Sequence, residues 1–226
     1  MTSSATDYAA IWTRSDAYHN THLIADPAPG LEAALSESKA EGLPEIAVSA
    51  AQGKFLNLLI RTHGWKRVLE VGTLGGYSTI WMANAIPADG KIVTLELSDK
   101  HAEVARKNVA NAGHAGKVEV IVGPALETLP GLSPDPPFDL AFIDADKESN
   151  TEYFVHAKRL VRPGGAIIVD NVGRQGNVAD ETNTEPRLEG VRRLLRYIKE
   201  DKTVDATTIH TVGDKGFDGF LYAIRL

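Results

Sequence analysis

From residue 67 onward, the chain alternates short apolar runs with longer segments in which apolar residues recur at helical spacing. The apolar runs are short enough for strands and lie at 67–72, 91–98, 117–123, 138–145 and 164–171. The helical segments lie between them, at 76–86, 99–113, 124–132 and 149–161, with Asp99 and Ser149 as expected N-caps. This alternation predicts an α/β protein whose parallel strands are joined by crossover helices.

Two further apolar runs, at 205–212 and 219–226, follow an amphipathic helical pattern at 187–202. Only the turn-rich stretch GDKGFD separates these two runs, which is too short for a parallel crossover, so they should pair antiparallel. The expected fold is therefore a doubly wound, Rossmann-like, seven-stranded mixed sheet, with the last strand antiparallel and helices on both faces.

Residues 1–65 read as helices, with breaks at DPAPG (26–30) and GLP (42–44) and a last helix at 50–64. The chain has 226 residues, which is enough for a substantial core. We expect a single domain over 1–226, in which the helical segment 1–65 precedes a Rossmann-like core at 66–226.

Charge and composition narrow the possible partners. The net charge of −6 disfavours a nucleic-acid partner, because proteins bind the phosphates of nucleic acid through clustered Lys and Arg. No apolar run approaches the roughly 20 residues of a membrane span, and the first residues lack a secretory pattern, so we expect a cytoplasmic protein without a membrane partner. Cysteine is absent, so any metal must use oxygen or imidazole ligands.

Acidic residues gather where the predicted strands end. In a doubly wound sheet, ligands bind at the carboxyl ends of the strands, near the point where strand order reverses. Of the five strands expected in the parallel part, four end in a carboxylate. Their acidic residues are Glu70, Glu96, Asp144 together with Asp146, and Asp170, which Asn171 follows. A purely structural sheet has no need of this pattern, which therefore indicates a ligand site.

The first strand-to-helix turn, EVGTLGGYS, carries Gly72, Gly75 and Gly76, which allow close approach of a ligand to the backbone. It matches neither the GxGxxG dinucleotide pattern nor a phosphate-binding loop. Glu96 ends the next strand, where an acid can accept both hydroxyls of a ribose. Together these features favour a nucleoside without a pyrophosphate, although glycines in such a turn are often only structural.

Asp144, Asp170 and Asn171 carry hard oxygen donors at the ends of what should be neighbouring strands. Such donors suit Mg²⁺, with Mn²⁺ or Ca²⁺ as alternatives, and three of them leave about three octahedral positions for water or for two substrate oxygens. The structural alternative is that Asp170 caps a loop and Asn171 forms a turn. Lys147 is then either a proton acceptor or the partner of an ordinary ion pair.

Four collinear motifs, VLEVGTLGGYSTIWMA, GPALETLP, FDLAFIDADK and LVRPGGAIIVDNV, resemble the cation-dependent S-adenosylmethionine O-methyltransferases, the group of the caffeoyl-CoA and catechol enzymes. The resemblance covers roughly residues 44–226. It implies metal ligands at Asp144, Asp170 and Asn171, a general base at Lys147 with Asp144 beside it, and a homodimer. The cofactor contacts that it implies are Val48, Glu70, Gly72, Thr73, Gly76, Ser78, Glu96, Ala125, Asp144 and Asp146.

The implied reaction is methylation of one hydroxyl of a catechol or another vicinal-dihydroxy aromatic, with a small phenolic substrate as partner. Lysine has a reference pKa of about 10.4, so we expect Lys147 to act as a base only in the metal-loaded site. The alternatives are a nicotinamide-dependent oxidoreductase and a catalytically silent scaffold of the same fold. The physiological acceptor and its regiochemistry stay open, and the polar segment 173–186 is either a lid or a surface loop.

Overall fold

The fold was examined in a computed structural model, which describes residues 7–24, 28 and 30–226. The predicted break at 26–30 lies largely outside these residues, whereas the break at 42–44 separates two observed helices. No helix within the described ranges is both long and apolar enough to cross a membrane.

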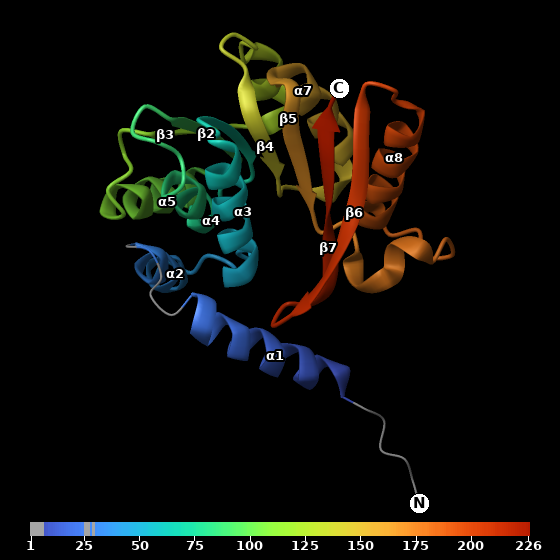
Figure 1. Ribbon diagram of the computed structural model, residues 1–226, viewed down its shortest axis with the longest axis horizontal. Helices are drawn as coiled ribbons and strands as arrows, with labels where there is room; N and C mark the ends of the chain where they lie inside the picture. Colours follow the sequence, from blue (N-terminus) through green and yellow to red (C-terminus); the bar gives the residue numbers. More distant parts are fainter. Residues whose placement is uncertain (1–6, 25–27, 29) are drawn as a thin grey trace, which may run out of the picture.

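Seven strands form one sheet in the order β3-β2-β1-β4-β5-β7-β6 (Figure 1). Their bounds are β1 Arg67–Val71, β2 Lys91–Glu96, β3 Val118–Val122, β4 Phe138–Ile143, β5 Val161–Asp170, β6 Val204–Gly213 and β7 Gly216–Arg225. The pairs among β1 to β5 are parallel, and β7 lies antiparallel between β5 and β6. The predicted mixed sheet with an antiparallel last strand is confirmed.

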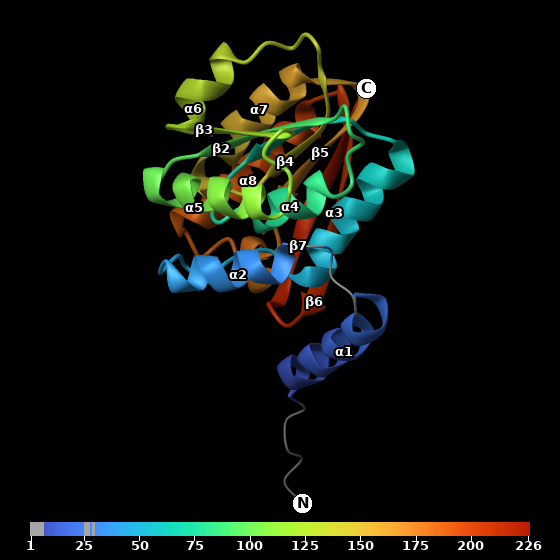
Figure 2. The ribbon, with the colours of Figure 1, turned by 90° about the vertical axis from the view of Figure 1, so that its left-hand side faces the viewer.

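Helices cover both faces of the sheet, as predicted (Figures 1 and 2). Helices α2 to α5 belong to one face and α6 to α8 to the other. The helix bounds are α1 Tyr8–Leu23, α2 Leu31–Ala40, α3 Ala50–His63, α4 Tyr77–Ala83, α5 Asp99–Asn111, α6 Ala125–Thr128, α7 Asn150–Leu160 and α8 Pro186–Glu200. Short 3-10 turns lie at η1 Leu129–Gly131, η2 Lys147–Ser149 and η3 Arg174–Ala179.

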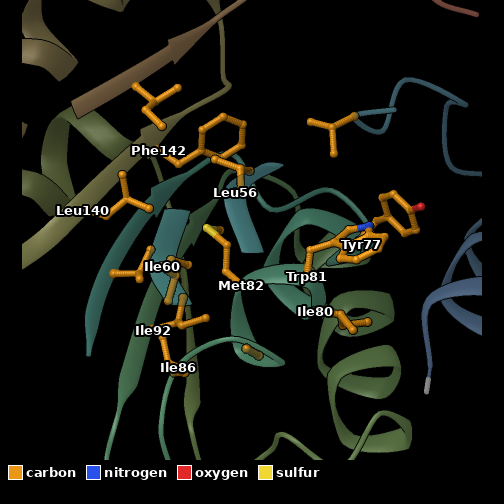
Figure 3. Close-up of a cluster of buried hydrophobic side chains, with 14 of the residues drawn as sticks. Leu56, Ile60, Tyr77, Ile80, Trp81, Met82, Ile86, Ile92, Leu140 and Phe142 are labelled. Carbon is orange, nitrogen blue, oxygen red and sulfur yellow. The ribbon is translucent and has the colours of Figure 1, made fainter. Parts of the chain in front are cut away.

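The central strands are apolar on both faces because each face packs against helices. Successive residues of β1 alternate, so that Val68 joins the core beneath α3 and α4 and Leu69 joins the core beneath α7 and α8. Figure 3 shows the first of these cores, in which Leu56 of α3 and Met82 of α4 accompany Phe142 of β4. Polar side chains therefore stand near the strand ends, with Arg67, Lys91 and Asp139 at the amino ends and Glu70 and Glu96 near the carboxyl ends.

Helix α1 lies beside the tip of the β6–β7 hairpin, outside the layers of the sheet and its covering helices (Figures 1 and 2). Trp12, Asp16 and Asn20 are half-buried at a spacing of four residues, and the other side chains of α1 are exposed. Asp16 Oδ2 accepts a hydrogen bond from the Asp214 amide at 3.3 Å. This spacing places one face of α1 on the hairpin and leaves the opposite face to solvent.

Candidate active site

The turn after β1 brings the ends of β1 and β4 into direct contact. Gly72 has φ +101°, and a Cβ at this position would lie 2.1 Å from the Asp144 carbonyl oxygen. Any side chain would therefore separate these strand ends, and the left-handed backbone would strain it. The Asp144 amide donates to the Val71 carbonyl at 2.8 Å, which fixes the start of the segment that carries Asp144 to Lys147.

Glu96, at the end of β2, holds this turn through its carboxylate. Oε2 accepts from the amides of Thr73 at 3.2 Å and Leu74 at 2.7 Å. Oε1 accepts from the Ser98 amide at 3.0 Å and lies 3.4 Å from His101 Nδ1. A ribose that binds to Glu96 therefore meets a carboxylate already oriented by backbone amides, with His101 beside it.

A cavity of about 690 Å³ opens above the turn, at the carboxyl ends of β1, β2 and β4. Its size falls within the range of small-molecule sites, and its wall is mostly apolar. Eight of the ten predicted cofactor residues line it, namely Val48, Gly72, Thr73, Ser78, Glu96, Ala125, Asp144 and Asp146. We refer to it as the cofactor cavity.

The other two predicted cofactor residues, Glu70 and Gly76, lie beneath the cofactor cavity. Glu70 is fully buried and accepts hydrogen bonds from the hydroxyls of Ser78 at 2.6 Å, Thr79 at 2.5 Å and Thr94 at 2.7 Å. Burial raises the pKa of Glu70 to about 7, although these three donors act against the rise. Glu70 thus ties α4 and β2 to β1, and Gly76, with φ +81°, forms the N-cap of α4.

Asp144, Asp170 and Asn171 come together where β4 and β5 end side by side. Asp170 is 4% exposed, and its Oδ1 accepts from the Asn171 amide at 2.8 Å. Burial, reinforced by the negative charge of Asp144, raises the pKa of Asp170 to about 7. Asn171 has a left-handed backbone, with φ +56°, which asparagine tolerates better than most residues.

Lys147 lies in the turn η2 and is 7% exposed. Its Nζ donates to Asp144 Oδ1 at 2.7 Å, so the ion pair considered as the alternative is present, and the predicted role as general base stays a prediction. Asp146 caps the same turn by accepting from the Ser149 amide at 3.2 Å. The Tyr153 hydroxyl also donates to Asp146, which the sequence did not indicate.

Helix α8 packs closely against the backbone of η2. A Cβ on Gly190 would lie 2.0 Å from the Lys147 carbonyl oxygen and 2.8 Å from the Glu148 Cα. Arg193, less than one turn further along α8, donates to the Glu148 carbonyl oxygen. The position of the Lys147 backbone therefore depends on close contact with a helix about forty residues later in the chain.

A second cavity, of about 790 Å³, lies on the other side of Asn171. Its wall comes from α1, α3 and the β6–β7 hairpin, and it includes Asp170, Phe55 and Phe220. Asp144 faces the cofactor cavity, Asp170 faces the second cavity, and Asn171 lines both. The three oxygen-bearing side chains thus lie at the junction of the two cavities. We refer to the second as the acceptor cavity, because the sequence leads us to expect a phenolic acceptor beside these side chains.

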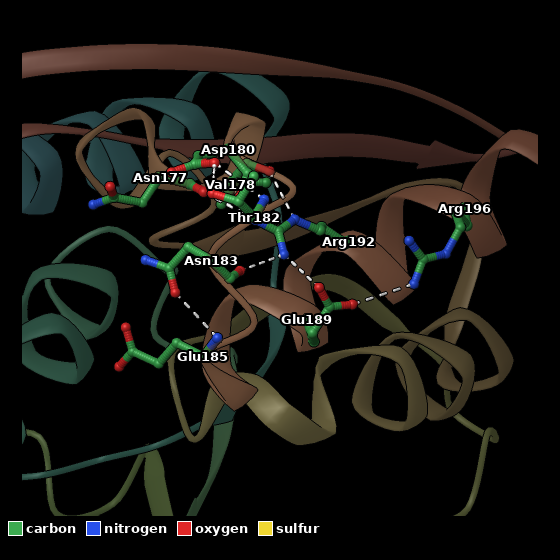
Figure 4. A network of polar contacts seen from close by, with 9 residues as sticks. All are labelled: Asn177, Val178, Asp180, Thr182, Asn183, Glu185, Glu189, Arg192 and Arg196. Atoms are coloured by element: carbon green, nitrogen blue, oxygen red, sulfur yellow. Dashed lines mark hydrogen bonds and ion pairs between the residues drawn. The ribbon is translucent and has the colours of Figure 1, made fainter.

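The polar segment 173–186 is fastened to α8 by Arg192, which is 7% exposed (Figure 4). The guanidinium donates to four carbonyl oxygens of the segment and to the Glu189 carboxylate, its backbone partners being Asn177, Val178, Asp180 and Asn183. Arg174, at the start of the segment, lines both cavities. The segment is thus anchored to α8 and brings one side chain to the site, and a role as a lid stays a prediction.

The described residues contain no cluster of three His, Asp or Glu side chains suited to a metal ion, so the candidate centre comprises two carboxylates and one amide. An all-oxygen set of this kind suits a hard divalent cation. Burial is the main cause of the raised pKa of Asp170, and repulsion by Asp144 adds to it; a cation between the two carboxylates would relieve that repulsion. The residues present therefore fit the metal that the sequence suggested.

The arrangement defines a Rossmann-like protein with a nucleoside-sized cavity at the carboxyl ends of its parallel strands and an acidic, oxygen-rich junction beside it. The family model of the O-methyltransferases matches residues 25–221. The chain therefore belongs to the O-methyltransferase family, which confirms the resemblance drawn from its motifs.

Relatives of known name span nearly the same length. The chain is 53% identical over 209 residues to a catechol O-methyltransferase of Mycobacterium tuberculosis, covering 92% of this chain and 94% of that one. It is 50% identical over 194 residues to a catechol O-methyltransferase of Niastella koreensis, covering 84% and 88%.

Solved structures agree with the fold. An O-methyltransferase from Bacillus cereus in complex with SAH superposes with a TM-score of 0.92 at 45% identity, covering 96% of this chain and 100% of that one. TomG from Streptomyces achromogenes, an O-methyltransferase in complex with SAM, superposes with a TM-score of 0.90 at 41% identity, covering 98% and 99%.

Proposed function

We propose that this protein transfers a methyl group from S-adenosylmethionine to one hydroxyl of a catechol or another vicinal-dihydroxy aromatic, with the help of a divalent cation. The observation that carries the proposal is the junction of the two cavities, where Asp144, Asp170 and Asn171 meet beside Lys147. The names of the two relatives at 50% identity or more support the choice of acceptor, and family membership favours it over a nicotinamide-dependent oxidoreductase.

The cofactor cavity supplies the groups that would orient the methyl donor. When bound, S-adenosylmethionine supplies a methyl group on a positively charged sulfur. Glu96 offers a carboxylate for the ribose, and the backbone around Gly72 gives close access to the strand ends. The mostly apolar wall would limit the contact of the bound cofactor with water. Well-oriented reactants can gain about 7–11 kcal/mol, so positioning accounts for much of the expected catalysis.

Asp144, Asp170 and Asn171 would hold the cation through oxygen atoms, with Mg²⁺ as the first choice and Mn²⁺ or Ca²⁺ as alternatives. When bound, such a cation supplies positive charge that increases the acidity of a neighbouring hydroxyl and gathers both oxygens of a vicinal diol. That positive charge would stabilise the ionised form of Asp170, which is almost fully buried, at neutral pH.

Lys147 is the group that we assign to proton transfer, with Asp144 holding its Nζ in place at 2.7 Å. The neutral Nζ accepts the hydroxyl proton of the acceptor while the acceptor oxygen bonds to the methyl carbon and the carbon–sulfur bond breaks, so S-adenosylhomocysteine leaves with the electron pair. Before the reaction the Lys147 Nζ donates to Asp144, so it must first release a proton to solvent in order to act as the acceptor.

The test is a methylation screen of phenol, catechol and a trihydroxylated benzene, with products identified by mass spectrometry. We expect methylation of the vicinal diols alone, its loss in EDTA and its recovery with Mg²⁺. Full activity in EDTA would contradict the metal, and turnover of phenol at the rate of catechol would contradict the diol requirement.

The role of Lys147 is tested with Lys147→Met at saturating cofactor and Mg²⁺. General-base catalysis is typically worth about 10²–10⁴-fold, so we expect a loss of kcat in that range. Lys158→Met is the matched control, because Lys158 also pairs with an aspartate, Asp201, but lies away from both cavities. Wild-type turnover by Lys147→Met would refute the assignment.

We also propose a homodimer, which the family resemblance suggests. Exposed apolar side chains of α1 support it, since Tyr8, Tyr18 and Leu23 are 61%, 65% and 70% exposed. Burial of such side chains against a second copy would remove apolar surface from water. Size-exclusion chromatography with light scattering is the test, and a monomer at all micromolar concentrations would contradict the proposal.

A further inference from the structure

Asp218 of β7 lies in the wall of the acceptor cavity, and its two carboxylate oxygens accept hydrogen bonds from different groups. Its Oδ1 accepts from three backbone amides, those of Gly173 at 3.0 Å, Arg174 at 2.9 Å and Gly219 at 2.9 Å. Its Oδ2 accepts from the side-chain Nδ2 of Asn171 at 3.3 Å. The first set of bonds orients the carboxylate, and the second bond connects it to a residue of the candidate metal centre.

This connection matters because the two ends of an asparagine amide are nearly equal in shape and opposite in chemistry. The oxygen accepts hydrogen bonds and binds cations, whereas the NH₂ group only donates. The backbone of Asn171 is fixed by its φ of +56° and by the hydrogen bond that its backbone N–H donates to Asp170 Oδ1. The choice of which end of the side-chain amide faces the cavities is then left to the neighbours of Asn171.

An ionised carboxylate only accepts, so the end of Asn171 that faces Asp218 must be the NH₂ group. The oxygen is thereby directed away from Asp218, on a residue that lines both cavities. We infer that Asp218 is a positioning residue, which sets the amide of Asn171 so that its oxygen faces the cation. This inference rests on the metal assignment proposed above.

The backbone around Asp218 is rigid enough for this role. A Cβ on Gly173 would lie 2.6 Å from the Asp218 carbonyl carbon, so β7 and the segment after β5 are in close contact. The Val172 amide also donates to the Gly219 carbonyl at 2.9 Å. The carboxylate of Asp218 therefore has little freedom to follow a displaced Asn171.

Asp218→Asn isolates the orienting function. Three backbone amides still require an acceptor, so the new side chain keeps its oxygen toward them and turns its NH₂ group toward Asn171. Two donors then face each other, and Asn171 relieves the conflict by turning its amide over. The amide end directed toward the cation becomes the NH₂ group, which cannot coordinate it.

The double variant Asn171→Asp with Asp218→Asn restores the pair with its roles exchanged. The NH₂ group of Asn at position 218 donates to one oxygen of Asp at position 171, and the other oxygen faces the cation. The summed charge of Asp144, Asp170 and positions 171 and 218 is the same as in the wild type, because the negative charge moves from position 218 to position 171. Asn171→Asp alone places the carboxylates of positions 171 and 218 against each other. It completes a double-mutant cycle with the other two variants.

The readout is Mn²⁺ binding, measured by the electron paramagnetic resonance signal of free Mn²⁺ in the absence of substrate. Partners of metal ligands typically contribute about 10–100-fold to affinity, so we expect Asp218→Asn to bind Mn²⁺ at least ten times more weakly and the double variant to recover most of the loss. Binding of S-adenosylhomocysteine without metal should be unchanged in Asp218→Asn, because Asp218 lies outside the wall of the cofactor cavity.

Wild-type affinity for Mn²⁺ in Asp218→Asn would overturn this inference alone and leave the metal assignment intact. A wild-type protein that binds no Mn²⁺ would overturn the metal assignment and the inference together. If Asp218→Asn does not fold, the double variant decides: a folded, Mn²⁺-binding protein supports the orienting role, and a double variant that fails to fold or to bind overturns it.

Discussion

Replacing Gly190 of α8 with alanine tests whether the position of η2, the turn that bears Lys147, depends on that helix. Gly190 is buried against η2, and the added methyl carbon would lie 2.0 Å from the Lys147 carbonyl oxygen. Ordinary van der Waals contact begins at 3.4 Å. The two backbones must therefore separate by about 1.4 Å, the difference between these distances. The obstacle is main chain on both sides, so no side-chain rotation relieves it.

The expected magnitude follows from two opposing effects. Alanine is about 1 kcal/mol more favourable than glycine in a helix interior. Overpacking of a tight contact costs about 1–3 kcal/mol, so the net free energy of unfolding should fall by about 0–2 kcal/mol. Activity should suffer more, because a displacement of about 1 Å at a reacting group can lower the rate by about 100-fold. We therefore expect a large loss of kcat with a modest loss of stability.

The assay pairs thermal unfolding with kcat for catechol at saturating cofactor and Mg²⁺. Gly116→Ala is the matched control, since a Cβ there would meet none of the described atoms within 4 Å. It should retain wild-type kcat. A Gly190→Ala protein whose kcat also matches the wild type would refute the idea that close packing of α8 positions Lys147.

Two further predictions concern stability. The pKa of Glu70 rises from 4.5 to about 7 on folding, so protonation of Glu70 stabilises the folded state fully below pH 4.5 and no longer does so above about pH 7. The free energy of unfolding should fall by about 3 kcal/mol over this range. Urea unfolding of Glu70→Gln should lack this component, and the same pH profile in the variant and the wild type would contradict the shift. Arg192→Met leaves four carbonyl groups of the 173–186 segment without their hydrogen-bond donor. The free energy of unfolding should fall by about 1–3 kcal/mol. A fall below about 0.5 kcal/mol would indicate that water replaces the guanidinium.

The sheet could be predicted from the sequence because strands and helices differ in the period of their apolar residues. The boundaries were less certain, and the cap of α5 shows why. Asp99 was the expected N-cap, but Ser98 occupies that position and accepts from the His101 amide at 3.4 Å, so Asp99 is the first helical residue. Serine and aspartate are both good caps, and spacing alone does not distinguish adjacent candidates.

The candidate site could be predicted as far as it depends on strand ends, because parallel strands bring their carboxyl ends to one edge of the sheet. Glu70 shows the limit of that reasoning. It follows Leu69 and precedes Val71, which both face α7 and α8, so alternation turns Glu70 to the opposite face, beneath α4. Its side chain consequently lies under the turn rather than in the cavity.

Other residues of the site could not be found from spacing. Arg192 and Asp218 act chiefly on backbone groups of segments that approach them only in the folded chain. Backbone amides and carbonyls carry no sequence signature, because every residue except proline offers both. The amphipathic pattern of 187–202 correctly indicated a helix but did not show that one of its arginines is buried.

Within four consecutive residues, α8 supports two parts of the site. Gly190 and Arg193 contact the turn that bears Lys147, and Arg192 holds the segment that begins at Arg174. A chimera that imports segment 173–186 from a relative would leave Arg192 opposite carbonyl groups in new positions. A shift of α8 in response would also displace the turn that bears Lys147. Grafts for this enzyme should therefore move the segment and its helix as one cassette.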